Sequence, residues 1–252
     1  MNINSVSQTS ICKICGNAEN LYGVTDFNTA CIQDHVHGYI YPLSGVAIYY
    51  HQCDSCGLIY TNAFDNWSTD DYAKHIYNDE YVKFDPAYPK IRPQENASFL
   101  LKNFSAIARL SVLDYGSGSG QLAEELKLRG ISISCWDPYG RDKNKPDGVF
   151  QLITCFEVFE HTANPKEVVS EISSLLDTDG FLFFTTLTND SMQQKCMDNW
   201  YIAPRNGHIS IYSKKSLTDL FSQFDMQVKT IDSSTHIAYK NNSSQAQRMN
   251  KT

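Results

Sequence analysis

Residues 111–120 read SVLDYGSGSG, an apolar run that ends in a carboxylate, Asp114, followed by a loop with glycine at every second position, Gly116, Gly118 and Gly120. A strand that enters a helix through a glycine-rich loop begins the first unit of doubly wound α/β folds. Ligands of such folds bind at the carboxyl ends of the strands. The stretch therefore predicts an α/β fold and places its binding site at this loop.

Strand and helix patterns alternate from residue 109 onward, as in a parallel α/β sheet. The strands are expected at 109–114, 131–136, 152–156 and 181–186, the helices at 120–129, 165–176 and 215–224, and a closing pair of strands at 226–232 and 235–240. Only 14 residues separate Asp137 from Leu152, too few for a helix, a strand and the return. The third strand of the sheet is therefore expected to be reduced or missing.

The carboxylate of Asp114 argues against a dinucleotide in the glycine loop. A carboxylate repels pyrophosphate, and more strongly in a desolvated crevice than in water. S-adenosylmethionine fits better, because Asp114 could hold its ammonium directly or through water. Asp137 ends the next strand, 17 residues after Gly120, where it could accept bonds from both ribose hydroxyls. Glu157, just beyond the strand at 152–156, is a further candidate for cofactor binding.

Candidate bases lie near the carboxyl end of the strand at 152–156. The segment CFEVFEHTANP carries Glu157, Glu160 and His161, and His208 lies in RNGHISIYS. Methyl transfer needs a base only when the acceptor loses a proton, and His161 is the first candidate, with His208 second. Glu157 and Glu160 are expected to raise the pKa of His161 above about 6.5. The alternatives are that His161 caps the next helix or bonds a backbone carbonyl, and that His208 has only a structural role.

Four of the eight cysteines form two CxxCG motifs, Cys12 with Cys15 and Cys53 with Cys56. Four thiolates in two such turns make a closed, tetrahedral zinc site of the structural kind. Zinc is expected to be required for folding the first 65 or so residues, but not for methyl transfer itself. Two unrelated turns or a redox pair remain the alternative. The histidines that could replace a thiolate are His35, His37 and His51.

Composition and charge narrow the class of partner. The net charge is −7 and no cluster of Lys and Arg occurs, which argues against a nucleic-acid partner and favours a small-molecule substrate. No run of 18 apolar residues could span a bilayer, and the N-terminus lacks the pattern of a secretion signal. We therefore expect no membrane partner and a cytoplasmic location.

The chain is expected to divide into a zinc-binding module (1–65), a helical and aromatic connector (66–105), an α/β core (106–241) and a disordered tail (242–252). Within the connector, helices are expected at 68–77, capped by Ser68, and at 94–104, after Pro93. The connector residues that could line a substrate site are Tyr72, Tyr77, Tyr81, Tyr88 and Arg92. Half-buried packing is the alternative for each of them.

Three separated stretches, VLDYGSGSG, the acid of CWDPY, and LITCFEVFEHTANPKEVVSEISSLLDTDGFLFFTT, resemble the core of class I S-adenosylmethionine-dependent methyltransferases over roughly residues 94–241. With the paired CxxCG motifs in front, the chain is also similar to the zinc-containing sugar C-methyltransferases that act on nucleotide-linked deoxysugars. Those enzymes usually carry a further C-terminal domain, which we expect to be absent here.

The resemblance implies a Rossmann-like methyltransferase sheet behind a small zinc-ribbon-like module, with S-adenosylmethionine and Zn²⁺ as cofactors. The expected activity is methyl transfer to a small molecule, first of all a sugar or nucleotide-sugar. An O-methyltransferase of another small metabolite is one alternative, and a catalytically inactive, methyltransferase-like binding or scaffold protein is another. The short segment after Asp137 leaves the adenine pocket under-built, so reduced affinity, or a homo-oligomer or partner that completes the pocket, is expected.

Overall fold

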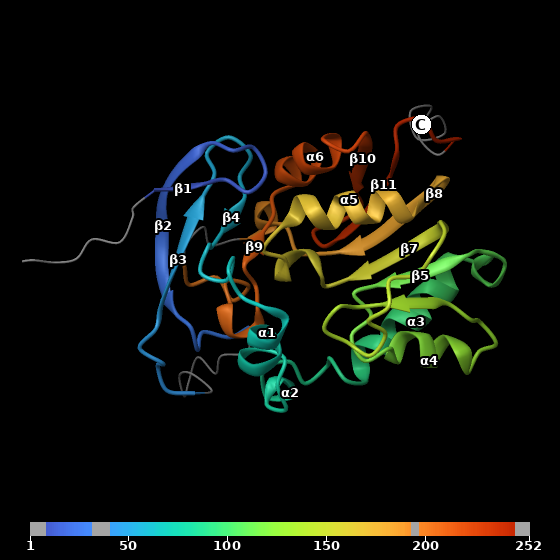
Figure 1. Ribbon diagram of the computed structural model, residues 1–252, viewed down its shortest axis with the longest axis horizontal. Coiled ribbons are helices and arrows are strands. Elements are labelled where there is room, and N and C mark those ends of the chain that lie inside the picture. The colour runs from blue at the N-terminus through green and yellow to red at the C-terminus, as the bar shows by residue number, and fades with distance from the viewer. Residues whose placement is uncertain (1–8, 32–40, 193–196, 245–252) are drawn as a thin grey trace, which may run out of the picture.

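The computed structural model describes residues 9–31, 41–192 and 197–244. Two β-sheets lie next to each other, a smaller one built mainly from the first quarter of the chain and a larger one covered by helices (Figure 1). No helix within the described ranges is long and apolar enough to cross a membrane.

The larger sheet has six strands in the order β10-β11-β8-β7-β5-β6. They are β5 (Val112–Tyr115), β6 (Ser134–Trp136), β7 (Phe150–Phe156), β8 (Leu176–Thr185), β10 (Met226–Thr230) and β11 (Thr235–Lys240). The strands β5 to β8 pair in parallel, and β11 runs antiparallel to both β8 and β10. Strand β6 lies at the edge, and residues 137–149, all of them described, form no helix or strand. The predicted Rossmann-like α/β sheet without its third strand is therefore confirmed.

Helices cover both faces of the larger sheet (Figure 1). On one face lie α3 (Ile91–Asn103) and α4 (Gln121–Lys127), and on the other α5 (Pro165–Leu175) and α6 (Lys214–Ser222). Successive strand residues point to opposite faces, so Val112 packs in the core that contains Leu122 of α4, while Leu113 packs in the core that contains Ile172 of α5. Strand β5 is consequently buried along its whole length, which holds the glycine loop that follows it in place.

The smaller sheet has five antiparallel strands in the order β1-β2-β3-β4-β9. They are β1 (Thr9–Ile11), β2 (Ala18–Asp26), β3 (Ala47–Gln52), β4 (Ile59–Tyr60) and β9 (Ser210–Ile211). Strand β9 comes from the segment between β8 and α6 of the larger sheet, and it pairs Ile211 with Ile59 and Ser210 with Tyr60. The two sheets are thus tied together by the backbone of residues 210–211.

The connector contains α1 (Thr69–His75) and α2 (Tyr81–Phe84), and Ser68 caps α1 as predicted. The next helix begins at Ile91, earlier than the expected start at 94, and Pro93 lies inside its first turn. Proline is tolerated there because its missing N–H has no partner within the helix. Short 3₁₀ turns occur at η1 (Ile107–Arg109), η2 (Phe159–His161), η3 (Asn189–Ser191) and η4 (Pro204–Asn206).

Two of the sequence predictions fall wholly or partly outside the described residues. His35 and His37 lie in the range 32–40, and most of the tail predicted to be disordered lies in the range 245–252. At the start of that tail, within the described residues, Ser243 is buried. The backbone N–H of Ser244 donates a hydrogen bond to the Asp179 side chain at 2.7 Å. The first residues of the tail therefore pack against the end of the larger sheet.

Candidate active site

A cavity of about 1020 Å³ lies at the carboxyl ends of β5, β6 and β7. Gly116 and Gly118 line it and have φ of 75° and 54°, in the left-handed region that glycine adopts without strain. A Cβ atom on Gly118 would lie 2.5 Å from the Tyr88 hydroxyl, so any other residue would have to displace that side chain. Gly120, at the start of α4, is not part of the lining; a Cβ there would lie 2.5 Å from the guanidinium of Arg141.

Asp114 lies at the end of β5, with only 4% of its surface exposed, and lines the cavity. The hydroxyl of Thr154, on the neighbouring strand β7, donates a hydrogen bond to its carboxylate at 2.9 Å. Burial raises the pKa of Asp114 to about 7, and the Thr154 bond opposes that shift while the charge of Asp137 adds to it. A cation in the cavity would therefore favour the ionised form of this carboxyl group.

Asp137 lies in the cavity wall, but its carboxylate is already engaged. One oxygen accepts the backbone N–H of Gly118 at 2.8 Å, and the other accepts those of Tyr139 at 2.7 Å and Gly140 at 2.8 Å. A carboxylate offers about four lone-pair positions. Since three are used, about one remains for a ligand, fewer than the two that a bidentate grip on a ribose diol requires.

Glu157 follows β7 directly and lines the cavity. Its φ of 53° is unusual for a residue other than glycine. Such a conformation costs on the order of 1–3 kcal/mol and persists only where the surroundings hold it. The hydroxyl of Thr185 does so here, because it accepts the backbone N–H of Glu157 at 3.1 Å and donates to its carboxylate at 2.8 Å.

Glu160, His161 and His208 bring potential ligand atoms within 4.8 Å of one another. Only His161 lines the cavity; Glu160 and His208 are buried behind it. Glu160 accepts a hydrogen bond from the Tyr201 hydroxyl at 2.7 Å through Oε1, while its Oε2 and the Nδ1 of His161 have no hydrogen-bond partner among the described residues. His208 Nδ1 must carry a proton, because it lies 3.0 Å from the backbone carbonyl of Tyr201, which can only accept. Of the two atoms without a partner, Glu160 Oε2 and His161 Nδ1, one could donate a hydrogen bond and the other could accept it.

Burial sets the protonation of this cluster. It lowers the pKa of His161 well below 6.5, with further lowering by His208 and Arg92 and opposition from the backbone carbonyls of Asn206 and Gly207. The expectation that Glu157 and Glu160 raise this pKa is therefore wrong, since burial lowers it and the groups that oppose the shift are backbone carbonyls. Burial also lowers the pKa of His208 to about 4 and raises that of Glu160.

The helix-capping alternative for His161 is also wrong, because the Asn164 side chain caps α5 by accepting the Glu167 N–H. The connector residues proposed for the substrate site, namely Tyr72, Tyr77, Tyr81, Tyr88 and Arg92, all line the cavity. Residues that the sequence reasoning missed include Trp67, Tyr139 and Glu167 in the lining and Thr154 beneath Asp114. Tyr139 carried a signal, because it lies two residues after Asp137.

The sulfur atoms of Cys12, Cys15, Cys53 and Cys56 lie within 4.8 Å of one another. The sulfurs of Cys12 and Cys56 are 3.6 Å apart, and those of Cys15 and Cys53 are 3.3 Å apart. Tetrahedral zinc with Zn–S bonds of about 2.3 Å separates its sulfurs by about 3.8 Å, which is close to these values. His51 does not belong to this group of donors. The chemistry and spacing of the four sulfurs therefore suit zinc.

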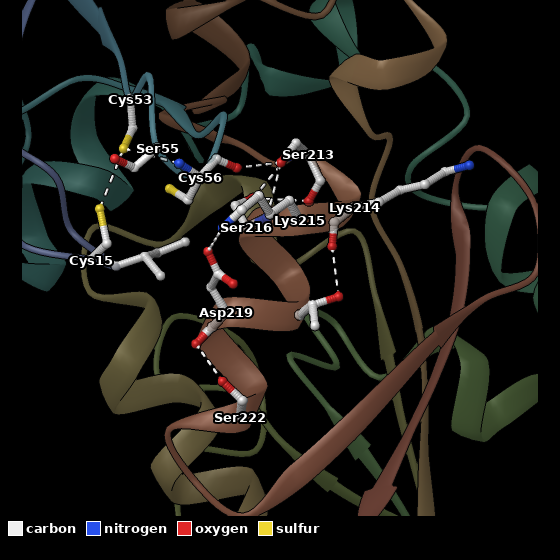
Figure 2. Close-up of polar contacts among 12 residues, drawn as sticks. Cys15, Cys53, Ser55, Cys56, Ser213, Lys214, Lys215, Ser216, Asp219 and Ser222 are labelled. Atoms are coloured by element: carbon white, nitrogen blue, oxygen red, sulfur yellow. Dashed lines mark hydrogen bonds and ion pairs between the residues drawn. The ribbon is translucent and has the colours of Figure 1, made fainter. Parts of the chain in front are cut away.

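The second cysteine turn packs against the start of α6 (Figure 2). The hydroxyl of Ser213, the N-cap of α6, donates to the backbone carbonyl of Cys56 at 2.5 Å. The side chain of Asn189 donates to the carbonyl of Gly57 at 2.7 Å. The cysteine cluster is therefore anchored to the segment between β8 and α6 by contacts separate from the β4–β9 pairing.

A family model described as a methyltransferase domain matches residues 88–231. Among curated proteins, the chain is similar to ubiquinone biosynthesis O-methyltransferase of Chromobacterium violaceum, 30% identical over 34% of this chain and 48% of the relative. It is also similar to the protein of that name from Acinetobacter baylyi, 22% identical over 44% of this chain and 57% of the relative. The chain thus spans about half the length of the curated relatives it matches.

Among solved structures, an O-methyltransferase family protein from Burkholderia thailandensis has a TM-score of 0.51 at 14% identity, over 71% of this chain and 64% of that one. At this identity the likeness shows a shared fold. It agrees with the α/β fold described above.

Proposed function

The chain belongs to the methyltransferase-domain family, and from that premise we propose that it transfers a methyl group from S-adenosylmethionine to a small-molecule acceptor. The observation that carries the proposal is one cavity that joins the glycine loop and buried Asp114 to His161. When bound, S-adenosylmethionine supplies a methyl group on an already activated sulfonium. The protein's task is then mainly to position two reactants, which is worth up to about 7–11 kcal/mol.

On the cofactor side, Gly116 and Gly118 let a ligand approach the backbone, because neither carries a side chain at a point of close contact. We assign to Asp114 the cofactor's ammonium, and to Asp137 no more than one ribose hydroxyl, since its other acceptor positions are filled. Gly120 supports the start of α4, and Glu157 is assigned to the cofactor through its held conformation at the end of β7.

On the acceptor side, His161 is proposed as the base that takes a proton when the acceptor must lose one. To accept that proton at Nε2, the neutral ring must carry its own hydrogen on Nδ1, and the unpaired Oε2 of Glu160 lies in the same cluster to accept a hydrogen bond from it. His208 would position His161, since their rings meet edge to face at 4.9 Å. The Tyr50 hydroxyl in turn holds the backbone carbonyl of His208 at 2.7 Å.

The acceptor is proposed as a small molecule, and two classes have support. The resemblance of the paired cysteine turns to those of the sugar C-methyltransferases favours a sugar or nucleotide-sugar, and the name of the curated relatives favours oxygen as the methylated atom. We also propose one structural zinc ion on Cys12, Cys15, Cys53 and Cys56. The division at residues 65, 105 and 241, a cytoplasmic location, and completion of the adenine side by a second copy or a partner remain proposals.

Calorimetry with S-adenosylhomocysteine and NAD tests the cofactor assignment, and release of S-adenosylhomocysteine in the presence of candidate acceptors tests the reaction. We expect binding of S-adenosylhomocysteine and none of NAD. Binding of NAD alone would overturn the assignment. Binding of S-adenosylhomocysteine with no turnover on any hydroxylated, keto or amino acceptor would favour the scaffold alternative.

A further inference from the structure

Four aromatic side chains, Trp67, Tyr72, Tyr77 and Tyr139, form one side of the cavity and are called here the aromatic wall. Their rings follow one another at centroid distances of 5.3 Å (Trp67–Tyr72), 5.5 Å (Tyr72–Tyr139) and 6.0 Å (Tyr139–Tyr77). The ring of Tyr77 then lies 6.2 Å from that of His161. The wall therefore leads to the proposed base, so that an acceptor in reach of His161 lies against it.

The charged groups of the cavity are mostly acidic. The carboxylates in its lining are Asp65, Asp114, Asp137, Glu157, Glu167 and Glu171. The two cations in the lining are already paired with carboxylates outside it, Arg92 with Asp85 at 2.7 Å and Arg141 with Glu124 at 3.1 Å. They therefore offset little of the cavity's negative charge.

Two of the six carboxylates have cationic partners of their own, Asp65 in Lys13 and Glu171 in Lys145. The other four, Asp114, Asp137, Glu157 and Glu167, have no Lys, Arg or His partner within 4.0 Å among the described residues. At neutral pH S-adenosylmethionine brings a single net positive charge, from its sulfonium, ammonium and carboxylate together. The cavity thus remains negative with the cofactor in place.

Glu167 brings part of this charge to the aromatic wall. It lies in the first turn of α5, at the rim of the cavity, and accepts a hydrogen bond from the Asn164 side chain at 3.0 Å. Burial raises the pKa of the Tyr139 hydroxyl, with further contributions from the charges of Asp137 and then Glu167. The electrostatic field of Glu167 therefore reaches the part of the wall where the acceptor would enter.

We propose that the acceptor carries a positively charged nitrogen group that lies against the aromatic wall. Aromatic faces attract cations, and the attraction grows when water is excluded. Unpaired carboxylates strengthen it, and they repel an anionic diphosphate, so an acceptor linked to a nucleotide diphosphate is disfavoured. The inference rests on the proposed function, because it takes the cofactor to fill the glycine-loop end of the same cavity.

The test measures binding of three probes by fluorescence titration to protein saturated with S-adenosylhomocysteine. The probes are choline, its uncharged carbon isostere 3,3-dimethylbutan-1-ol, and UDP-glucose. We expect choline to bind about tenfold more tightly than its isostere, the ratio that a desolvated cation–π contact gives. UDP-glucose is expected to bind more weakly than choline because of its diphosphate.

Variants localise the effect. Trp67→Leu should reduce the preference for choline over its isostere to about twofold, and Glu167→Gln, at a screened rim position, should lower choline affinity by about threefold. Matched controls are Trp200→Leu and Glu95→Gln, whose side chains are exposed and lie outside the cavity lining. If Trp67→Leu fails to fold, Glu167→Gln carries the test, because it keeps the size of the side chain and one oxygen that can accept the Asn164 hydrogen bond.

The two proposals can fail separately. Absence of S-adenosylhomocysteine binding removes the proposed function, and this inference with it. Binding of S-adenosylhomocysteine together with equal affinity for choline and its isostere, or with tighter binding of UDP-glucose, overturns the inference and leaves the proposed function standing. Equal responses of Glu167→Gln and Glu95→Gln also overturn it, because the charge would then act only at long range.

Discussion

The two sides of the cavity are built in different ways. The cofactor side consists of residues at the carboxyl ends of the parallel strands, namely Asp114 near the end of β5 and the glycine loop after it, Asp137 after β6, and Glu157 after β7. Each of these residues is placed by its own strand. The cofactor side should therefore survive damage to other parts of the chain.

The acceptor side is assembled from distant segments. The aromatic wall comes from the connector and from Tyr139, while His161 packs against His208, which lies two residues before β9. Because β9 pairs with β4 of the smaller sheet, the position of His208 depends in part on the segment of the chain that carries the cysteines. The comparison teaches that cofactor binding and catalysis should be separable by mutation.

The largest effect, one on folding free energy, is expected from loss of the cysteine cluster. A structural zinc site contributes about 10 kcal/mol or more to the folding of a small metal-dependent unit, so Cys53→Ser should abolish zinc content and loosen the smaller sheet. Displacement of β9 then misplaces His208 and His161, and a shift of about 1 Å costs roughly 10²-fold in turnover. Affinity for S-adenosylhomocysteine should change by less than about threefold, because the residues of the cofactor side are held by strands of the larger sheet.

Metal analysis, turnover and calorimetry check this prediction, with Ser55→Ala in the same turn as the control. Full turnover in zinc-free Cys53→Ser would show that the two sheets act independently, as the sequence alone suggested. Loss of S-adenosylhomocysteine binding in the same variant would show that the cofactor side also depends on the smaller sheet.

The next effect isolates the base without disturbing the smaller sheet. His161→Gln should lower turnover by about 10²- to 10⁴-fold, the usual contribution of a positioned base, while leaving affinity for S-adenosylhomocysteine unchanged. The exposed His75 supplies the control His75→Gln. If the His161 variant keeps wild-type turnover on every acceptor that the protein accepts, the methylated atom needs no base.

The strands of the core could be predicted from the sequence because their signals are local. Residues close together in the chain are enough to recognise the apolar run and glycine loop at 111–120 and the acids at the strand ends. The missing third strand follows from the small number of residues between Asp137 and the next strand. The pairing of β4 with β9 could not be predicted, because each strand has only two residues and they lie about 150 positions apart. The lowered pKa of His161 was missed for a related reason, since burial is set by long-range packing.

A moderate effect with a clear pH dependence is expected at Asp114. Its pKa of about 7 means that the carboxylate forms as pH rises through neutrality. Affinity for cationic S-adenosylmethionine should therefore increase from pH 6 to pH 8. Asp114→Asn should abolish this pH dependence. At pH 8 it should also weaken the binding of S-adenosylmethionine by about ten- to a hundredfold, the value of a hydrogen bond to a charged group.

Stability without cofactor should run the other way. The pKa of Asp114 is raised above the ordinary value of 3.8, so its contribution to stability is complete below that value and is lost as pH rises through about 7. The melting temperature of the free protein should fall across that interval, and less so in Asp114→Asn. Parallel pH slopes for binding and stability would contradict the assignment, and Asp219→Asn, on α6 and outside the cavity lining, controls for a general charge effect.

The smallest effect is expected on the ribose side. With about one acceptor position left on Asp137, the removal of one particular ribose hydroxyl should weaken binding by about tenfold, while removal of the other should cost less than about twofold. Adenosine, 2′-deoxyadenosine and 3′-deoxyadenosine, each competing with S-adenosylhomocysteine, measure the two contributions separately. In Asp137→Asn the difference between the two deoxynucleosides should disappear, because the amide nitrogen cannot accept the remaining bond when its single oxygen holds the backbone N–H groups.

Equal losses for both deoxynucleosides would mean that Asp137 grips the diol through both hydroxyls, which requires the 138–141 loop to release at least one backbone N–H on binding. In that case Asp137 would not only brace the glycine loop but would exchange a backbone partner for the ribose when the cofactor binds. It would also couple the ribose to Arg141, whose backbone N–H donates to the carbonyl of Gly118 at 2.9 Å. The cofactor side would then rearrange when the cofactor binds. It would differ from the acceptor side in which segments of the chain move, rather than in being fixed by its own strands.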